Sequence, residues 1–210
     1  MNIDTDSSCV GKSAYMKDRG ITAVGRYYSQ VNTYKNITKV EAEELSLAGI
    51  EIFTVYEDHG KKEALILSED TGKNHAEAAA NQAQEIGQPE GTTIYFALEG
   101  LPSGYTSADL PDIRKYFRGI IEGLAGRYAP GVYGDGIVCQ TLLDEGICSH
   151  AWLAQASYSF EGSKEFYASR RWTLAQIVTD LDKDKWEGPS VDLNEQNGYC
   201  GGFFIAVEVA

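Results

Sequence analysis

The sequence has no long apolar run and no basic cluster. No apolar stretch among its 210 residues approaches the ~18 residues that a membrane-spanning helix requires. Its longest basic runs are the pairs Lys61-Lys62 and Arg170-Arg171, and 31 acidic against 18 basic residues give a formal net charge of −13. Such a surface repels nucleic-acid phosphates and anionic lipids. We therefore expect no membrane insertion, no nucleic-acid partner, and a substrate that is uncharged or of mixed charge.

Several catalytic and cofactor motifs are also missing. The sequence contains no GxGxxG, P-loop, HExxH or GxSxG pattern, which excludes the usual nucleotide sites, zinc peptidases and α/β-hydrolases. The three histidines show no metal-ligand spacing, so we expect neither a metal nor a cofactor.

The four cysteines show no CxxC spacing. If any disulfide forms, we favour Cys9 with Cys200, because these residues follow the first and last predicted strands, which closure of a barrel makes neighbours. The alternative is that Cys9, Cys139, Cys148 and Cys200 are four reduced, buried thiols, as free cysteines usually are.

Short apolar runs alternate with segments of helical periodicity, which indicates a parallel sheet with helical crossovers. Eight such runs in this length favour an α/β fold, a closed (β/α)8 TIM-like barrel, in a single domain over 1–210. Segments 157–170 and 177–187 have weak periodicity, so we expect a degenerate barrel whose later helices are short or missing. The tail 198–210 is expected to add a strand or a partner-binding extension. Three helices are expected from their capping signals: one from Thr38–Glu41 to Gly49, one over His75–Ile86 capped by Asn74 and ended by Gly87, and one from Ser107 or Asp109 to Tyr128.

A polar side chain follows nearly every apolar run. In a parallel barrel, residues at the carboxyl ends of the strands gather at one face, where active sites lie. The pattern therefore predicts a single functional mouth. The residues expected at this mouth, each directly after an apolar run, are Asp4, Tyr28, Glu57, Glu99, Asp135, Gln155, Gln176 and Asp192.

Carboxylates dominate this predicted mouth, and a pair of carboxylates is what glycoside hydrolysis requires. Glu99 follows the most hydrophobic run, Thr93–Leu98, so desolvation is expected to raise its pKa and suit it to be the general acid. Glu57 ends the preceding strand, and Asp4 and Asp192 are expected to end the first and last strands, which closure makes neighbours. These three acids are the candidate catalytic partners of Glu99.

Aromatic and amide side chains near the same strand ends are the candidates for binding a sugar. Tyr28, Tyr133 and Trp152 are expected to stack on sugar rings, with core packing as the alternative reading. Arg26 either pairs an acid inside the barrel or forms an ordinary buried ion pair. Asp135, Gln155 and Gln176 complete the predicted substrate-binding set and are expected to orient the glycan.

Eight motifs in order resemble a known family, the glycoside-hydrolase-like barrel domain of unknown function found in many bacterial proteins. That family is related to the family 25 lysozymes, which cleave peptidoglycan between muramic acid and glucosamine. The resemblance places Asp4 at the first-strand acid, Glu99 at the catalytic acid and Asp192 at the last-strand acid. Ala97 stands where the lysozymes carry the first acid of Asp-x-Glu. The motifs are Gly25–Ser29, Lys39–Glu44 with Ala48-Gly49, Val55–Glu57, Ile94–Glu99, Gly131–Gly134, Trp152–Gln155, Leu174–Gln176 and Val191–Asn194.

These features together predict a lysozyme-like hydrolase of the bacterial cell wall with an antibacterial role and a peptidoglycan substrate. Two alternatives stay open: a barrel that binds carbohydrate without cleaving it, which Ala97 would explain, and a glycosidase for another bacterial polysaccharide. Segment Met1–Cys9 carries acids where a signal peptide carries basic and then apolar residues, so we expect synthesis in the cytoplasm followed by leaderless delivery or leader removal. An immunity or delivery protein as partner is left open.

Overall fold

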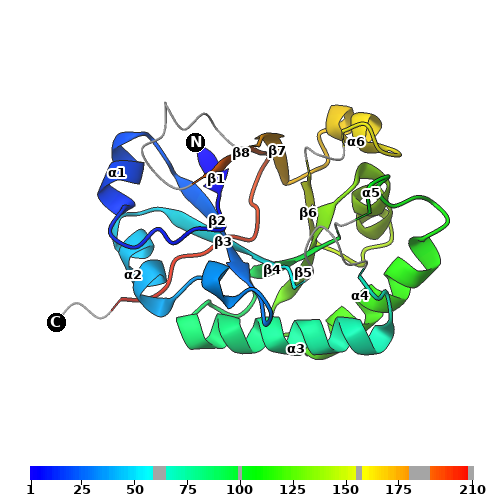
Figure 1. The fold of residues 1–210 in the computed structure, drawn as a ribbon, viewed down its shortest axis with the longest axis horizontal. Helices are drawn as coiled ribbons and strands as arrows, with labels where there is room; N and C mark the ends of the chain where they lie inside the picture. The colour runs from blue at the N-terminus through cyan, green and yellow to red at the C-terminus, as the bar shows by residue number, and fades with distance from the viewer. Residues whose placement is uncertain (59–64, 99–100, 155–157, 180–189, 208–210) are drawn as a thin grey trace.

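The computed structural model describes residues 1–58, 65–98, 101–154, 158–179 and 190–207. Its eight strands close into a barrel in chain order (Figure 1), which confirms the predicted fold class. The strands are β1 (Asn2–Asp4), β2 (Ala23–Tyr28), β3 (Glu51–Tyr56), β4 (Thr93–Ala97), β5 (Ala129–Gly134), β6 (His150–Leu153), β7 (Leu174–Val178) and β8 (Asp192–Gln196).

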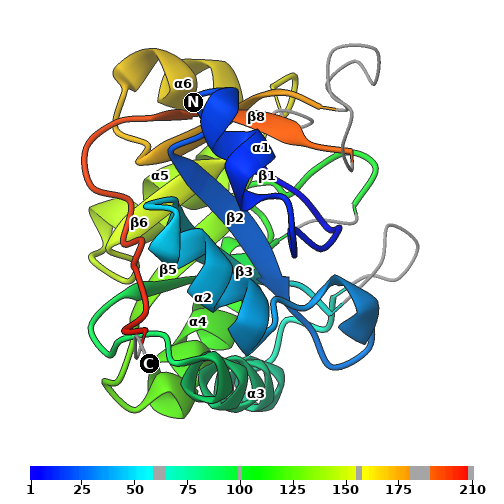
Figure 2. The same cartoon turned by 90° about the vertical axis from the view of Figure 1, so that its left-hand side faces the viewer.

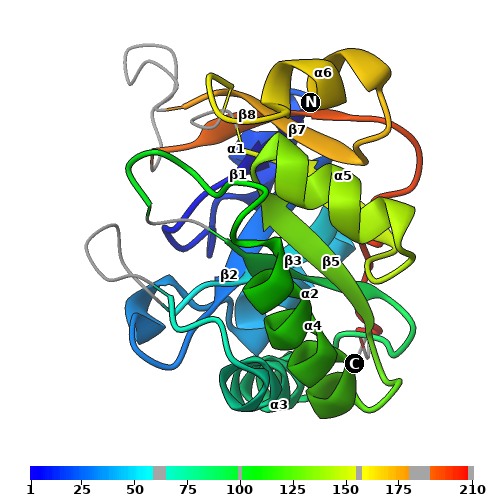
Figure 3. The same cartoon turned by 90° about the vertical axis from the view of Figure 1, so that its right-hand side faces the viewer.

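Helices cover the outside of the barrel. Figures 1 and 3 show the two longest helices, α3 and α4, side by side along one flank, and α5 and α6 on another. Helix α6 has seven residues, as expected for a barrel with short later helices. Described residues form α1 (Ser13–Asp18), the 3₁₀ turn η1 (Thr33–Lys35), α2 (Lys39–Leu47), α3 (Glu69–Ile86), α4 (Leu110–Leu124), α5 (Gly136–Asp144) and α6 (Ser163–Ser169).

The last strand runs against the others. Strand β8 pairs antiparallel with both β7 and β1, whereas β1 through β7 pair in parallel. The expectation that Asp192 ends its strand is therefore wrong, because Asp192 is the first residue of β8. The reversal nevertheless brings it to the predicted face, since the register places Asp192 opposite Asp4, the last residue of β1.

Helix ends agree in part with the predicted caps. The Thr38 hydroxyl accepts the backbone N–H of Glu41 at 3.2 Å, as predicted for the start of α2. Gly87 ends α3 with a φ of +84°, a left-handed conformation that glycine adopts without strain. The predicted start at His75 is wrong, because Ser68 caps the helix and α3 begins at Glu69. Asn74 lies inside this helix.

Glycines let α3 and α4 approach backbone to backbone. A Cβ on Gly72 of α3 would lie 1.9 Å from the carbonyl oxygen of Tyr116, and a Cβ on Gly119 of α4 would lie 1.9 Å from that of Glu69. Gly123, four residues after Gly119, would place a Cβ 2.5 Å from the carbonyl oxygen of Lys73. Glycines therefore stand at the positions where any larger residue would force the two helices apart.

The chain segment after β8 packs under the end of the barrel opposite the predicted mouth. The Tyr95 hydroxyl, inside the barrel, donates to the carbonyl of Cys200 at 2.8 Å. Phe203 then pairs antiparallel with Ile52 as a single bridge, near the start of β3. In Figure 2 this segment runs along the left edge of the molecule. All four cysteines are free and buried, so the Cys9–Cys200 disulfide does not form.

The barrel encloses a compact aromatic core. Phe53, Tyr95, Tyr133 and Trp152 fill it, with the Tyr133 and Trp152 ring centroids 4.6 Å apart. A second, larger core lies between the strands and the surrounding helices. Within the described residues, none of the helices is both long and apolar enough to cross a bilayer.

Candidate functional site

Alternate side chains of β2 point into the barrel and out toward the helices, and this decides which predicted site residues can reach the mouth. Ala23 and Tyr27 belong to the core inside the barrel, whereas Val24 and Tyr28 belong to the core beneath the helices. Tyr28 is fully buried there, and its hydroxyl donates to Oε1 of Gln88 at 2.7 Å. The prediction that Tyr28 stacks on a sugar is therefore wrong, because a strand alternates its side chains and Tyr27 takes the inward position.

Arg26 also faces outward and does not reach the mouth. Its Nε donates to Oε1 of Glu41 on α2 at 2.6 Å, with both side chains almost wholly buried. The second guanidinium nitrogen donates to the backbone carbonyl of Thr5. Glu41 also accepts the backbone N–H of Cys9 at 2.9 Å. Arg26 thus forms the buried ion pair given above as its alternative reading, and its predicted role in substrate binding is wrong.

Asp4 is the centre of a hydrogen-bond network at the carboxyl end of β1. Its side chain is 2% exposed. Oδ2 accepts an N–H from Asn194 of β8 at 2.7 Å and one from Gln176 of β7 at 3.4 Å, and Oδ1 accepts the Tyr27 hydroxyl at 3.4 Å. Side chains from three other strands, β2, β7 and β8, therefore donate hydrogen bonds to this one carboxyl group on β1.

Two aromatic donors set the orientation of the amides that hold Asp4. The Trp152 indole N–H can only donate, and it donates to Oδ1 of Asn194 at 2.8 Å, which turns the Asn194 N–H₂ toward Asp4. Similarly, the Tyr133 hydroxyl donates to Oε1 of Gln176 at 3.3 Å, and Nε2 of Gln176 then faces the acids. Trp152 and Tyr133 are thus buried supports of the network rather than the sugar-stacking surfaces predicted for them.

Asp192 is the second acid of this network. Nε2 of Gln176 donates to its Oδ2 at 2.8 Å and to Oδ2 of Asp4, so one amide bridges both carboxyl groups. Burial is the main cause that raises the pKa of Asp4, and the nearby charge of Asp192 is the second. The bonds from Asn194, Gln176 and Tyr27 oppose them, and the pKa with all of these effects together is about 8. Asp192 itself is half-buried and lies toward solvent from Asp4.

Glu57 approaches the same mouth from β3. Its Oε2 lies 2.5 Å from Nζ of Lys35, which belongs to the η1 turn after β2. Nζ of Lys35 also lies 4.8 Å from the centroid of the Tyr27 ring, and the Tyr27 hydroxyl contacts Asp4. A continuous series of contacts therefore joins Glu57 to the Asp4–Asp192 pair, which brings three of the four predicted acids together.

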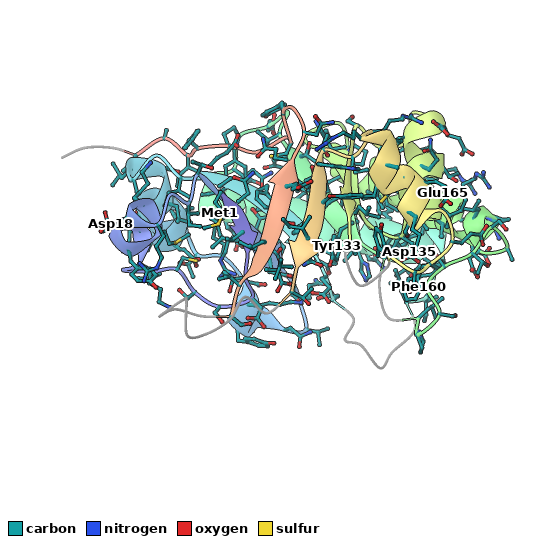
Figure 4. The ribbon with its side chains drawn as sticks, turned by 90° about the horizontal axis from the view of Figure 1, so that it is seen from above. Met1, Asp18, Tyr133, Asp135, Phe160 and Glu165 are labelled. Carbon is teal, nitrogen blue, oxygen red and sulfur yellow. The ribbon has the colours of Figure 1, made fainter. Side chains whose placement is uncertain are left out.

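Asp135 lies beneath loops rather than in this network. It is the residue directly before α5, at the N-cap position, but its side chain does not bond the helix; its Oδ2 accepts the backbone N–H of Tyr105 at 2.5 Å instead. A Cβ on Gly104 would lie 2.4 Å from the Phe160 ring and 2.7 Å from Oδ2 of Asp135. The side chains of Phe160 and Asp135 therefore pack directly against the backbone of the loop that contains Gly104 and Tyr105. Burial raises the pKa of Asp135 to about 6. Figure 4 shows Asp135 and Phe160 together on the right, with Tyr133 nearer the centre of the barrel.

Two predicted residues, Glu99 and Gln155, lie outside the described residues. The strand before Glu99 is described, and its Tyr95 and Ala97 face the interior of the barrel. Ala97 pairs with Tyr133 in the β4–β5 register and is 1% exposed. An inward-facing apolar methyl group thus stands at the position to which the family resemblance assigns the first acid of Asp-x-Glu.

Three residues of the network are absent from the sequence-based prediction: Asn194, Tyr27 and Lys35. Asn194 was detectable in principle, because it lies two positions after Asp192 and a strand returns to the same face every second residue. The inward position of Tyr27 depends on the alternation of β2, and Lys35 belongs to a loop turn, for which the sequence offers no periodic signal. Among the described residues, no group of three or more His, Cys, Asp or Glu side chains is arranged to hold a metal ion.

Residues 14–198 match the family model of the Rv2525c-like, glycoside hydrolase-like domain. The uncharacterized protein YbfG of Bacillus subtilis is 28% identical over 201 residues, covering 84% of this chain and 27% of YbfG. The chain spans less than a third of the length of the curated relatives that it matches.

Among solved structures, the Tat-secreted protein Rv2525c of Mycobacterium tuberculosis has a similar fold, with a TM-score of 0.79 at 21% identity over 95% of this chain and 97% of Rv2525c. The lysozyme from Streptomyces coelicolor has a TM-score of 0.54 at 16% identity over 94% of this chain and 91% of the lysozyme. At these identities the likeness establishes the fold alone.

Proposed function

Because the chain belongs to the family of Rv2525c-like, glycoside hydrolase-like domains, we propose that it is a glycoside hydrolase with lysozyme-like specificity for peptidoglycan. The observation that carries this proposal is the convergence of Asp4, Asp192 and Glu57 at one end of the barrel, linked through Gln176, Tyr27 and Lys35. Active sites of such barrels lie at the face formed by the carboxyl ends of the parallel strands, and all three acids lie at that face, Asp192 because the antiparallel β8 begins there. The similar fold of the Streptomyces lysozyme supports the choice of substrate class.

In the proposed reaction, Glu99 protonates the glycosidic oxygen as the bond between that oxygen and the anomeric carbon breaks. The sugar then carries positive charge at the anomeric carbon, and in this scheme Asp192 and Glu57 stabilise that charge or activate the attacking water. Asp4 is buried and is linked to Asp192 through Gln176, so it does not contact the glycan. In this scheme it influences the ionisation of Asp192 instead.

Substitution of Glu99 tests the proposed general acid. Glu99→Gln keeps the size of the side chain and removes the proton donor, so release of reducing ends from purified sacculi should fall about 10²–10⁴-fold, the usual contribution of such a group. Glu122→Gln is the matched control, because Glu122 is an exposed glutamate on α4 paired only with the exposed Lys73 among the described residues. Equal turnover by wild type and Glu99→Gln would remove Glu99 from the mechanism.

A second candidate function is glycan binding without cleavage, and the inward-facing Ala97 is the observation that favours it. A barrel of this kind would bind soluble peptidoglycan fragments with saturation and release no reducing ends. Its affinity would be unchanged in Glu99→Gln. The same sacculus preparation, assayed for bound protein and for new reducing ends, separates the two functions.

We also propose that the protein acts on the cell wall outside the cytoplasm. The similar protein Rv2525c is described as Tat-secreted, which supports export. Immunoblotting of cytoplasmic, wall and culture fractions from the source cells checks this, and a protein confined to the cytoplasmic fraction would contradict it.

A further inference from the structure

Asp4 and Asp192 are neighbours across the β1–β8 register, and a single amide nitrogen of Gln176 donates to both. Two negative charges that share one donor repel each other strongly when one of them is buried. Such a pair lowers its energy by binding one proton on one of its two carboxyl groups, and the titration then belongs to the pair.

Asn194 determines where on Asp4 that proton resides. The Trp152 indole can only donate, so it holds Oδ1 of Asn194 and forces the Asn194 N–H₂ toward Oδ2 of Asp4. A proton on Oδ2 would point at this N–H₂ group at 2.7 Å, whereas Oδ1 faces the Tyr27 hydroxyl, which both donates and accepts. Oδ1 is therefore the oxygen of Asp4 that can carry a proton.

The nearby positive charges are paired with other acids and do not neutralise Asp4. Within the described part of the chain, Asp192 on β8 is the charged group that acts on Asp4, while Gln176, Asn194, Tyr133 and Trp152 contribute neutral dipoles from β5 to β8. On the β2 side, the Lys35 ammonium is held by Glu57 at 2.5 Å. The Arg26 guanidinium, on the outer face of β2, is paired with Glu41 and with the Thr5 carbonyl.

Resting on the proposed function, we propose that Asp4 and Asp192 share one proton, that Asp4 carries it on Oδ1, and that Asn194 is the positioning residue that keeps it there. Asp192 then presents the single negative charge of the pair to a glycan. This assigns different tasks to two chemically identical side chains through their environments, with Asp4 neutral and buried and Asp192 ionised and half-buried.

Carboxyl ¹³C NMR of protein labelled in its aspartates tests the proposal without any substrate. The resonance of Asp4 is the one lost in Asp4→Asn. The pH midpoint of the Asp4 titration should lie well above the ordinary value for aspartate. Asp192→Asn should weaken the proton affinity of Asp4 at least about tenfold, which lowers this midpoint by at least about one pH unit. Asn194→Ala and Trp152→Phe should move the midpoint upward instead, because the ionised form loses an oriented N–H donor.

Glu195→Gln is the matched control, since Glu195 follows Asn194 in β8, carries a charge and bonds Tyr167 on the other face of the strand. An Asp4 midpoint near the ordinary aspartate value, or one unmoved by Asp192→Asn, overturns the shared proton. Midpoints unmoved by both Asn194→Ala and Trp152→Phe overturn the role of Asn194. A protein that titrates as expected and yet cleaves no glycan supports the shared proton and contradicts only the proposed hydrolase function.

Discussion

At the scale of single residues, the position of a side chain along its strand decided which sequence-based predictions were correct. Asp4, Gln176 and Asp192 were expected at one mouth, and the structure joins them through a single amide. Tyr28 and Arg26 were assigned to the wrong face of β2. The reason is that this strand is buried on both faces, so its composition contains no alternation of apolar and polar residues that would fix which side chains point inward.

The buried acid Asp4 should leave a signature in the stability of the protein. Its pKa rises from 3.8 to about 8 on folding, so between these values the folded chain holds a proton that the unfolded chain has lost. The free energy of unfolding contributed by Asp4 therefore falls as the pH rises through this window, by at most about 1.4 kcal/mol per pH unit. Asp4→Asn removes this titration. The free energy of unfolding of the variant should therefore increase relative to that of the wild type as the pH rises toward 8.

Urea denaturation at several pH values between about 4 and 8 measures this effect directly. Asn is nearly isosteric with a protonated Asp, so the fold has little reason to change. Parallel stability profiles for the two proteins would show that Asp4 ionises normally in the folded state.

At the scale of helices and strands, the sequence predicted the existence of elements better than their ends and directions. The Thr38 and Gly87 signals marked a true start and a true end, because capping depends on neighbouring residues only. The first six residues of α3, Glu69–Asn74, were missed, since Ser68 and Asn74 are both suitable caps and nothing local chooses between them. The reversed direction of β8 was missed because the pattern of a strand is the same read either way.

Packing between α3 and α4 gives a prediction at this scale. Gly119→Ala would place a methyl group 1.9 Å from the Glu69 carbonyl oxygen, so the helices must separate. We expect a loss of about 2–3 kcal/mol in the free energy of unfolding, despite the better helix propensity of alanine. Thermal or urea unfolding measures it.

Glu122→Ala is the control for this substitution, because it makes the same new residue on an exposed position of the same helix. Its stability should stay within about 0.5 kcal/mol of the wild type. Equal stability of Gly119→Ala and Glu122→Ala would contradict the close approach of the two helices.

At the scale of the whole molecule, closure of the barrel makes the site. Asp4 and Asp192 are 188 positions apart in the sequence, and only the β1–β8 pairing makes them neighbours. Closure and the family were predictable from the order of the motifs, because eight strand ends in one chain have few other arrangements. The supporting roles of Trp152 and Tyr133 were not, because they depend on distances inside the barrel that no sequence pattern encodes.

The most direct test of the proposed hydrolase function is the identity of the ends that the protein creates in peptidoglycan. Purified sacculi are incubated with the wild-type protein and with Glu99→Gln, and the soluble fragments are analysed by mass spectrometry after reduction of their new ends. A lysozyme-like hydrolase that uses Glu99 as its acid releases fragments with reduced muramic acid at the new terminus, so these are expected from the wild type, and few or none from Glu99→Gln. Wild-type protein that binds the sacculi and releases no such fragments would contradict the proposed hydrolase function.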